Sequence, residues 1–343
     1  MIDSSQTPAS RPKLYLAVFF GLLFFGFGSI WVFSATARNA YMDSDYGQWT
    51  AKMQMVHECR VGDVAVIGDS RASVDIVPAL LRPLSVKNFA LTGATPVEGF
   101  YQLKRILDCP KPPKAILLAF APRQYEEINW FWLHAARYGF FSFADLEEVR
   151  GMEAGLGKPN LYKGAFGTEP PGAIKNWLYV NSFPTFNFAS MLAAKGAGRG
   201  RDNNLIRQTT LVTDGQHLEG TAACATDPGW EAARESFELN PLVKLYLDRL
   251  LSLAKSRGVR VDILIPPVSA MTARDLSPGY RDGFAKFLGQ IVQTYPGITL
   301  IGSPFLVMDD CSFGDQHHLN QGGAEAFTRH IAPLIRQVLA SSD

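Results

Sequence analysis

The feature that most constrains this chain is a run of uncharged residues at positions 14–37. A helix rises about 1.5 Å per residue, so this run would be about 36 Å long, enough to cross the hydrocarbon core of a bilayer with some tilt. Its centre reads LYLAVFFGLLFFGFGSIWVF, and no later segment is equally long and apolar. The pattern therefore predicts one transmembrane helix.

Charged residues flank this run asymmetrically. Arg11 and Lys13 precede it, whereas Asp43 and Asp45 follow it. Since basic residues stay on the cytoplasmic side, we expect the bulk of the chain to be exported. A cleaved signal peptide is the alternative, because the Ala-Thr-Ala sequence at 35–37 fits a cleavage site. The apolar run is longer than the usual signal-peptide core of about 7–15 residues, which favours an uncleaved anchor.

The flanking charges predict a division of the chain into parts. We expect a cytoplasmic tail at 1–13, a signal anchor in the inner (cytoplasmic) membrane at 14–37 and a linker at 38–60. The remaining residues, 61–343, would form one exported domain with an insertion at about 123–240.

Composition excludes some classes of protein. Hydrophobic residues make up 47% of the 343 residues and charged residues 19%, which is too apolar for a disordered chain. Lys and Arg number 33 and Asp and Glu 32, giving a formal net charge of +1. Proteins that bind nucleic acids usually carry a basic excess, so no nucleic-acid partner is expected.

The four cysteines are Cys59, Cys109, Cys224 and Cys311, and they fit an oxidising compartment. Their spacings are not those of a metal site, and three pairings are possible. Cys59 and Cys109 each precede a predicted strand, so they can form a bridge if those strands are neighbours. Unpaired buried thiols are the alternative.

Outside the insertion, short apolar segments alternate with helix-like segments. Uniformly apolar strands separated by helices predict an α/β fold with a parallel five-stranded sheet covered on both faces. The insertion is rich in Gly, Pro, Asn and aromatic residues and is expected to be largely irregular. The predicted strands lie at 64–68, 86–91, 115–121, 261–267 and 298–303, and the predicted helices at 73–81, 96–107, 241–257, 283–295 and 322–339.

A Gly-Asp-Ser-Arg sequence directly follows the first predicted strand, with its serine at Ser70. A serine at a strand-to-helix turn exposes its hydroxyl, and its N–H points outward at the helix N-terminus, where it can stabilise an oxyanion. The plain alternative is a helix cap, since Asp and Ser both favour that position.

An Asp-Gln-His-His-Leu-Asn sequence follows the fifth predicted strand. Asp315 stands three residues before His318 and can orient its ring, which can then accept a proton from a serine hydroxyl. This spacing favours His318 over His317 as the base.

A third signal is Asn88-Phe89-Ala90-Leu91-Thr92-Gly93, at the end of the second predicted strand. The N–H of Gly93 can approach a substrate closely, although an ordinary turn glycine explains it equally well. Asn88 is a further candidate for binding substrate. Ligands of open parallel sheets bind at the carboxyl ends of the strands, where all three signals are expected to meet.

Together these motifs resemble those of the SGNH/GDSL superfamily, over residues 64–122 and 241–339. The resemblance implies a flavodoxin-like three-layer α/β/α sandwich. It also implies Ser70 as nucleophile, His318 as base, Asp315 as orienting acid, and the N–H groups of Ser70 and Gly93 as oxyanion donors.

One departure from the family concerns its third block, where an asparagine usually completes the oxyanion hole. Here the third strand is followed by Pro122-Arg123-Gln124, and Arg123 or Gln124 would have to substitute. Membrane-anchored members associated with polysaccharide O-acylation, similar to alginate O-acetylation and teichoic-acid D-alanyl transfer proteins, often lack the standard block.

The insertion begins with an aromatic cluster that includes Trp130 and Trp132. Such side chains can stack on sugar rings or rest at a membrane interface, or they can build a local core. Because the cluster closely follows the third strand, both tryptophans are candidates for binding substrate.

The resemblance and the anchor predict an O-acyltransferase that moves an acyl group, expected to be acetyl, through Ser70 to a cell-envelope or exopolysaccharide glycan. The expected partners are a multi-pass membrane acyltransferase as donor and the polysaccharide as acceptor. This mechanism needs no metal or diffusible cofactor. The alternatives are an esterase with the same triad, and a scaffold that binds glycan or a partner with a degraded catalytic centre.

Overall fold

The computed structural model describes residues 11–156, 172–195 and 198–340. Positions 1–10 of the expected tail and 157–171 and 196–197 of the expected insertion lie outside the described residues. The elements are, in chain order, α1 (Arg11–Thr36), α2 (Arg38–Tyr41), α3 (Asp45–His57), β1 (Val64–Gly68), α4 (Ser70–Asp75), η1 (Pro78–Leu81), β2 (Val86–Asn88), α5 (Pro96–Leu107), β3 (Ala115–Ala119), η2 (Pro122–Tyr125), η3 (Trp132–Ala136), α6 (Phe143–Gly155), α7 (Gly172–Val180), α8 (Pro184–Ala193), α9 (Gly200–Val212), η4 (Trp230–Ala233), α10 (Pro241–Ser256), β4 (Arg260–Leu264), β5 (Val268–Ser269), α11 (Ala270–Asp275), α12 (Pro278–Thr294), β6 (Thr299–Ile301), β7 (Val307–Met308), η5 (Asp310–Ser312) and α13 (Gln321–Ala340).

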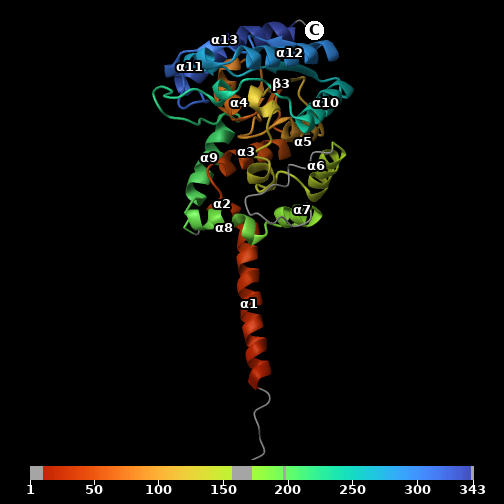
Figure 1. The fold of residues 1–343 in the computed structure, drawn as a ribbon, viewed down its shortest axis with the longest axis vertical. Helices are drawn as coiled ribbons and strands as arrows, with labels where there is room; N and C mark the ends of the chain where they lie inside the picture. Colours follow the sequence, from red (N-terminus) through yellow and green to blue (C-terminus); the bar gives the residue numbers. More distant parts are fainter. Residues whose placement is uncertain (1–10, 157–171, 196–197, 341–343) are drawn as a thin grey trace, which may run out of the picture.

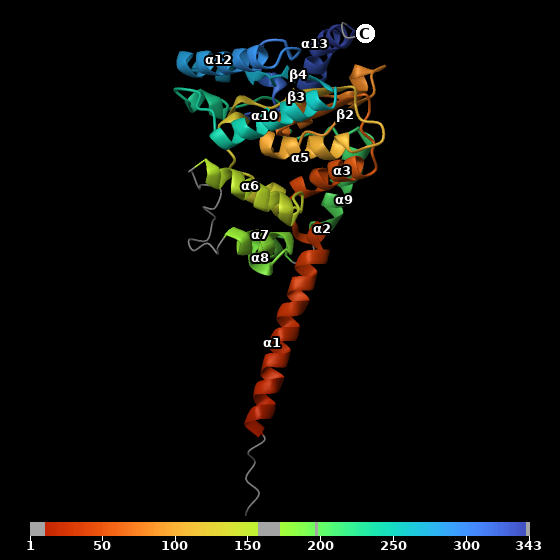
Figure 2. The same cartoon turned by 90° about the vertical axis from the view of Figure 1, so that its right-hand side faces the viewer.

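Helix α1 projects from the rest of the molecule as a single long rod (Figure 1). It is the one helix within the described residues that is long and apolar enough to cross a membrane, over Pro12–Thr36. Its apolar side chains are largely uncovered; Phe24, for example, is 81% exposed. Helices α7 and α8 lie beside the end of α1 nearest the body, and the sheet lies further away (Figure 2).

The centre of the fold is a five-stranded sheet in the order β2-β1-β3-β4-β6. All of its neighbouring strands are parallel, and Val64 of β1 pairs with Val86 on one side and Ala115 on the other. This confirms the predicted α/β class and parallel five-stranded sheet. A further parallel pair, β5 with β7, was not expected from the sequence.

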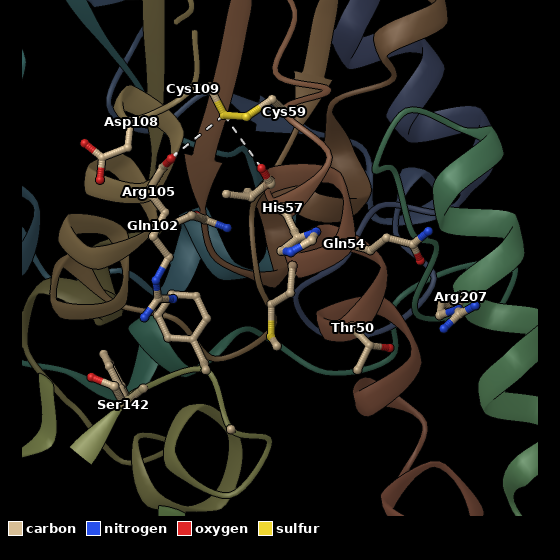
Figure 3. A pocket seen from close by; sticks show the side chains of 15 residues that line it. Thr50, Gln54, His57, Cys59, Gln102, Arg105, Asp108, Cys109, Ser142 and Arg207 are labelled. Atoms are coloured by element: carbon tan, nitrogen blue, oxygen red, sulfur yellow. Dashed lines mark hydrogen bonds between the residues drawn. A yellow bond between two sulfur atoms is a disulfide. The ribbon is translucent and has the colours of Figure 1, made fainter. Parts of the chain in front are cut away.

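Two disulfides join distant parts of the chain. Cys59 is bonded to Cys109, as expected if β1 and β3 are neighbours, and Cys224 is bonded to Cys311. The first disulfide lies on the wall of a pocket of about 950 Å³ among α3, α5 and α9 (Figure 3). Each bond closes a long loop, which restricts the unfolded chain and so stabilises the fold.

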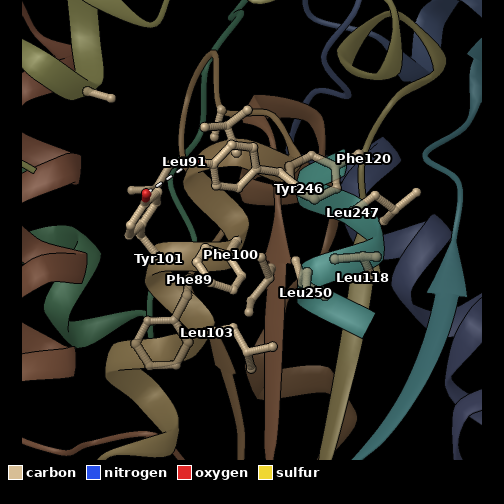
Figure 4. Packing of buried hydrophobic residues seen from close by; sticks show 14 of the residues in the cluster. Phe89, Leu91, Phe100, Tyr101, Leu103, Leu118, Phe120, Tyr246, Leu247 and Leu250 are labelled. Atoms are coloured by element: carbon tan, nitrogen blue, oxygen red, sulfur yellow. Dashed lines mark hydrogen bonds between the residues drawn. The ribbon is translucent and has the colours of Figure 1, made fainter. Parts of the chain in front are cut away.

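The sheet is buried on both faces because alternate residues of its strands enter different apolar clusters. Ile67 of β1 and Leu118 of β3 belong to the larger cluster, whereas Val66 and Leu117 belong to the smaller one. Helices α5, α10 and α12 contribute to the larger cluster and α13 to the smaller one. Figure 4 shows the side chains of α5 and α10 packed against the central strands.

Two predicted parts of the chain differ from the structure. Residues 38–60, predicted as a linker, contain α2 and α3, and Trp49 is fully buried. The insertion is not mainly irregular, since α6 to α9 lie within it. Helix α9 buries polar residues, Asn203 and Thr210, so it lacks the apolar periodicity by which a helix is recognised in a sequence.

Candidate active site

Ser70 lies at the turn between β1 and α4 because Asp69 fixes that turn. The buried Asp69 carboxylate caps α4 by accepting the N–H groups of Arg71 at 3.1 Å and Ala72 at 3.4 Å. Its second oxygen accepts the Ala121 N–H at 2.9 Å, which joins the ends of β1 and β3. The cap is therefore Asp69, and the Ser70 hydroxyl is left for another partner.

That partner is His318, from the loop before α13. His318 Nε2 lies 2.8 Å from Ser70 Oγ, and His318 Nδ1 lies 2.8 Å from Asp315 Oδ2. The three predicted residues thus form one continuous hydrogen-bonded chain, although 248 positions separate Ser70 from His318. Such a chain lets the imidazole accept a hydroxyl proton while the carboxylate holds the ring.

Asp315 is held by its own loop. Its Oδ1 accepts the N–H groups of His317 at 2.7 Å and His318 at 2.8 Å. Burial raises the pKa of Asp315, but the hydrogen bonds from His318 and from these two N–H groups outweigh burial and lower it. Asp315 is therefore a stable anion beside the ring.

Acidic groups around His318 favour its charged form. Burial lowers the pKa of His318, but the hydrogen bond with Asp315 and the nearby carboxylates of Glu219 and Asp75 raise it to about 9. The imidazole is thus largely protonated at neutral pH and becomes a base as the pH approaches 9.

Glu219, which lies within the insertion, belongs to no motif in the sequence and was not predicted to be near the site. Its Oε2 is 3.4 Å from His318 Nε2, on the side of the ring that faces Ser70. Its Oε1 accepts hydrogen bonds from Thr92 Oγ1 at 2.5 Å and Gln48 Nε2 at 3.0 Å. These bonds hold the Glu219 carboxylate beside His318, which thus has a second acidic neighbour besides Asp315. No spacing between motifs in the sequence predicts this neighbour.

The backbone N–H groups of Ser70 and Gly93 are available as hydrogen-bond donors at the pocket. Ser70 and Gly93 both line a pocket of about 170 Å³, and the N–H of neither bonds to another described residue. Gly93 has a φ of +73°, and a Cβ there would lie 2.8 Å from Trp130 Cβ and 2.9 Å from His134 Nδ1. Only glycine fits this position without displacing its neighbours.

Arg123 and Gln124 both line the pocket, but their side chains differ in their partners. Arg123 Nε bonds to Glu127 Oε2 at 2.9 Å, and its guanidinium lies 3.7 Å from the centre of the Trp230 ring. The Gln124 amide bonds to no other side chain or backbone group in the described part of the chain. Gln124 is therefore the better placed of the two to donate to a bound substrate.

Aromatic side chains stand on the pocket walls. Trp130 is 38% exposed and Trp230 is 45% exposed, and both line the pocket. Trp230 packs on His317, with 4.1 Å between the ring centres. Trp130 was a candidate from the sequence and lines the pocket, whereas Trp230 was not singled out from the sequence.

His317 belongs to a buried polar cluster rather than to the triad. Arg71 Nη2 donates to Glu231 Oε1 at 2.6 Å and to His317 Nδ1 at 3.3 Å. Burial and the Arg71 charge lower the pKa of His317 to about 3. His317 is therefore neutral, and the structure places His318 rather than His317 beside Ser70.

Two of the candidate residues, Asn88 and Trp132, do not line the pocket. Asn88 is fully buried and donates to the Ala72 carbonyl at 2.8 Å and the Ile76 carbonyl at 3.0 Å, which fixes the end of α4. Trp132 packs against Tyr179 in the insertion, with 4.8 Å between ring centres. Both side chains build local structure.

The larger pocket of Figure 3 lacks the arrangement seen at Ser70. Its hydroxyl groups are engaged with backbone: Thr50 Oγ1 donates to the Tyr46 carbonyl, and Ser142 Oγ accepts the Asp145 N–H. Its cysteines are joined in a disulfide. The smaller pocket is therefore the candidate active site. Within the described ranges, no group of three or more His, Cys, Asp or Glu side chains is arranged to hold a metal ion.

Comparison with known proteins identifies no relative, since no family model, curated protein or solved structure matches the chain.

Proposed function

We propose that this chain is a membrane-anchored, exported O-acyltransferase of the SGNH type, which transfers a short acyl group through Ser70 to a glycan hydroxyl. The observation that carries the proposal is the hydrogen-bonded chain from Ser70 Oγ through His318 to Asp315, with both contacts at 2.8 Å.

The arrangement of the sheet supports an SGNH-type, flavodoxin-like fold. Numbered along the chain, the five strands of the main sheet lie in the order 2-1-3-4-5, which is the flavodoxin-like order. Ser70 and Gly93 follow the first and second of these strands, where open α/β sheets bind their ligands.

In the first step, Ser70 Oγ would attack the carbonyl carbon of the acyl donor while His318 Nε2 accepts the hydroxyl proton. The N–H groups of Ser70 and Gly93, with the Gln124 amide, would stabilise the negative oxygen of the tetrahedral intermediate. This assigns Gln124 the place of the family's asparagine. The leaving group then departs with the proton from His318, and Ser70 carries the acyl group as an ester.

In the second step, His318 would remove the proton of an acceptor hydroxyl, whose oxygen attacks the ester carbonyl. Collapse of the intermediate breaks the bond to Ser70 Oγ, which regains a proton from His318. Asp315 keeps the ring oriented throughout by holding Nδ1.

The pocket supports a short acyl group and a sugar acceptor. Its volume of about 170 Å³ is well below the roughly 300–1,000 Å³ of sites that hold drug-sized ligands. The half-exposed indoles of Trp130 and Trp230 offer apolar faces on which a sugar ring can stack.

The anchor and the disulfides support export. Helix α1 is suited to hold the domain at the cytoplasmic membrane, and both disulfides suit an oxidising compartment outside the cytoplasm. A multi-pass membrane acyltransferase would deliver the acyl group to Ser70, and a cell-envelope or extracellular polysaccharide would accept it.

The test uses the full chain in detergent with an aryl acetate as donor and an oligosaccharide as acceptor. Mass spectrometry of the products distinguishes acetylated sugar from free acetate. We expect acetylated sugar with the native chain and with the Ser256→Ala control, whose serine is exposed on α10, and none with Ser70→Ala. Free acetate alone would identify an esterase, and no turnover by the folded chain would favour a binding scaffold.

A further inference from the structure

Helices α7 and α8 present an apolar, uncharged surface to solvent. On α7, Ile174 is 51% exposed and Trp177 is 47% exposed, and on α8, Phe188 is 57% and Leu192 is 63% exposed. Helix α8 contains no charged residue, and the one charged residue of α7, Lys175, is buried. An exposed surface of this kind marks a site of interaction.

Helix α1 holds these two helices at a defined height. Trp31 Nε1 donates to the Asn181 carbonyl at 2.7 Å, and Ser34 Oγ donates to the Ser182 carbonyl at 2.6 Å. The Phe183 ring also packs on Trp31, with 5.1 Å between ring centres. The turn between α7 and α8 is thus attached to the last third of the apolar helix.

The length of α1 gives the depth of the α7–α8 turn relative to the outer boundary of the hydrocarbon core. A hydrocarbon core of about 30 Å needs about 20 helical residues, so a span that begins at Leu14 ends near Phe33. Trp31 then lies about 3 Å below the outer boundary, and Phe27, which packs on Phe183, about 9 Å below it. The contacts of the α7–α8 turn therefore range from Ser34, just outside the boundary, to Phe27, and their lower part falls within the depth of about 5–10 Å to which interfacial helices insert.

Basic side chains lie next to this surface. Lys195 and Arg201 are exposed just after α8, and Arg199 is held at the end of α2 by a hydrogen bond from its Nη1 to the Tyr41 carbonyl at 3.4 Å. Basic residues at this level can contact the phosphates of anionic headgroups.

We propose that α7 and α8 form a second membrane contact, in which their exposed apolar faces insert into the outer boundary of the bilayer. The bilayer is the partner, because α1 places these helices at its surface. The contact fixes the orientation of the domain, which α1 alone would leave free to swivel. This inference rests on the proposed anchoring by α1 and is independent of the chemistry at Ser70.

The test uses the full chain in vesicles of phosphatidylcholine and phosphatidylglycerol. All four native cysteines are in disulfides, so an introduced cysteine is the only free thiol for a nitroxide label. Labels replace Phe188 on α8, Phe24 on α1 and Val292 on α12 in three separate variants. Val292 is 37% exposed, and helix α12 lies at the end of the molecule away from α1 (Figure 2). Collision with oxygen, relative to a water-soluble nickel chelate, reports insertion into the bilayer.

We expect the oxygen-to-nickel ratio at Phe188→Cys to exceed the ratio at Val292→Cys several-fold and to approach the ratio at Phe24→Cys. A label at Leu192→Cys, also on α8, should give a ratio similar to that at Phe188→Cys. Equal ratios at 188 and 292, with a high ratio at 24, would overturn the second contact and leave the anchor intact. A low ratio at 24 as well would overturn the anchor and this inference together, without bearing on Ser70.

Discussion

Replacing Glu219 by glutamine tests how the pocket sets the basicity of His318. The carboxylate lies 3.4 Å from His318 Nε2 and is one of the groups that raise the pKa of His318 to about 9. Glutamine retains an oxygen that can accept the Thr92 hydrogen bond but removes the negative charge. In the variant, His318 should therefore be a weaker base that loses its proton at a lower pH.

The geometry gives the size of this effect. Two unit charges 3.4 Å apart interact by about 1.2 kcal/mol even at the dielectric constant of water, which corresponds to nearly one pKa unit. Opposite charges within ~4–6 Å shift a pKa by about 1–3 in proteins. We expect the pKa of His318 to fall by at least about 1. The neutral fraction of the ring at pH 7 then rises about tenfold.

The assay is the rate at which a fluorophosphonate labels Ser70, measured from pH 5 to pH 10. The native rate should rise with pH and level off above about 9, because the ring must lose its proton before it can act as a base. The profile of Glu219→Gln should lie at least one pH unit lower. That of Glu325→Gln, a half-buried carboxylate on α13 that pairs with Arg329, should match the native profile. Identical profiles for the native chain and Glu219→Gln would refute this account of the site's electrostatics.

Other changes test the remaining parts of the site. Asp315→Asn should reduce Ser70 labelling by about 10⁴-fold, because the carboxylate no longer holds His318; a loss below tenfold would argue against its role. Gly93→Ala places a methyl group 2.8 Å from the Cβ of Trp130, at a residue whose φ of +73° disfavours any side chain. The variant should therefore unfold at a lower urea concentration than the native chain, and an equal urea midpoint would contradict the assigned geometry. Glu231→Gln leaves the buried Arg71 charge unpaired and should lower the free energy of unfolding by about 3–5 kcal/mol, which denaturant titration measures.

The central sheet could be predicted from the sequence because its signals are local. The apolar segment at Val64–Gly68 matches β1 at both ends. Helix α5, with Pro96 in its first turn and apolar residues at helical spacing, also has the predicted bounds. The Asp315 and His318 pair was found because both residues lie on one loop at a spacing with a chemical meaning.

The parts that the sequence missed depend on contacts between distant segments. Helix α3 buries Gln48 and Lys52 together with Trp49 and Met55, and Lys52 Nζ donates to Ser73 Oγ at 2.6 Å. Its buried face therefore mixes polar and apolar residues and shows no clear apolar stripe in the sequence. Glu219 reaches His318 only because the insertion folds back over the ends of the strands. That Asn88 does not line the pocket could not be predicted, because a buried asparagine that holds backbone carbonyls looks the same in a sequence as one that faces a substrate.

The most direct measurement asks whether Ser70 is an activated nucleophile. The full chain in detergent is treated with a fluorophosphonate, and the modified residue is located by mass spectrometry of its peptides. The account predicts one adduct, on Ser70, that is lost in His318→Ala while that variant keeps its native circular dichroism. An adduct on another serine, or equal labelling of Ser70 with and without His318, would contradict it.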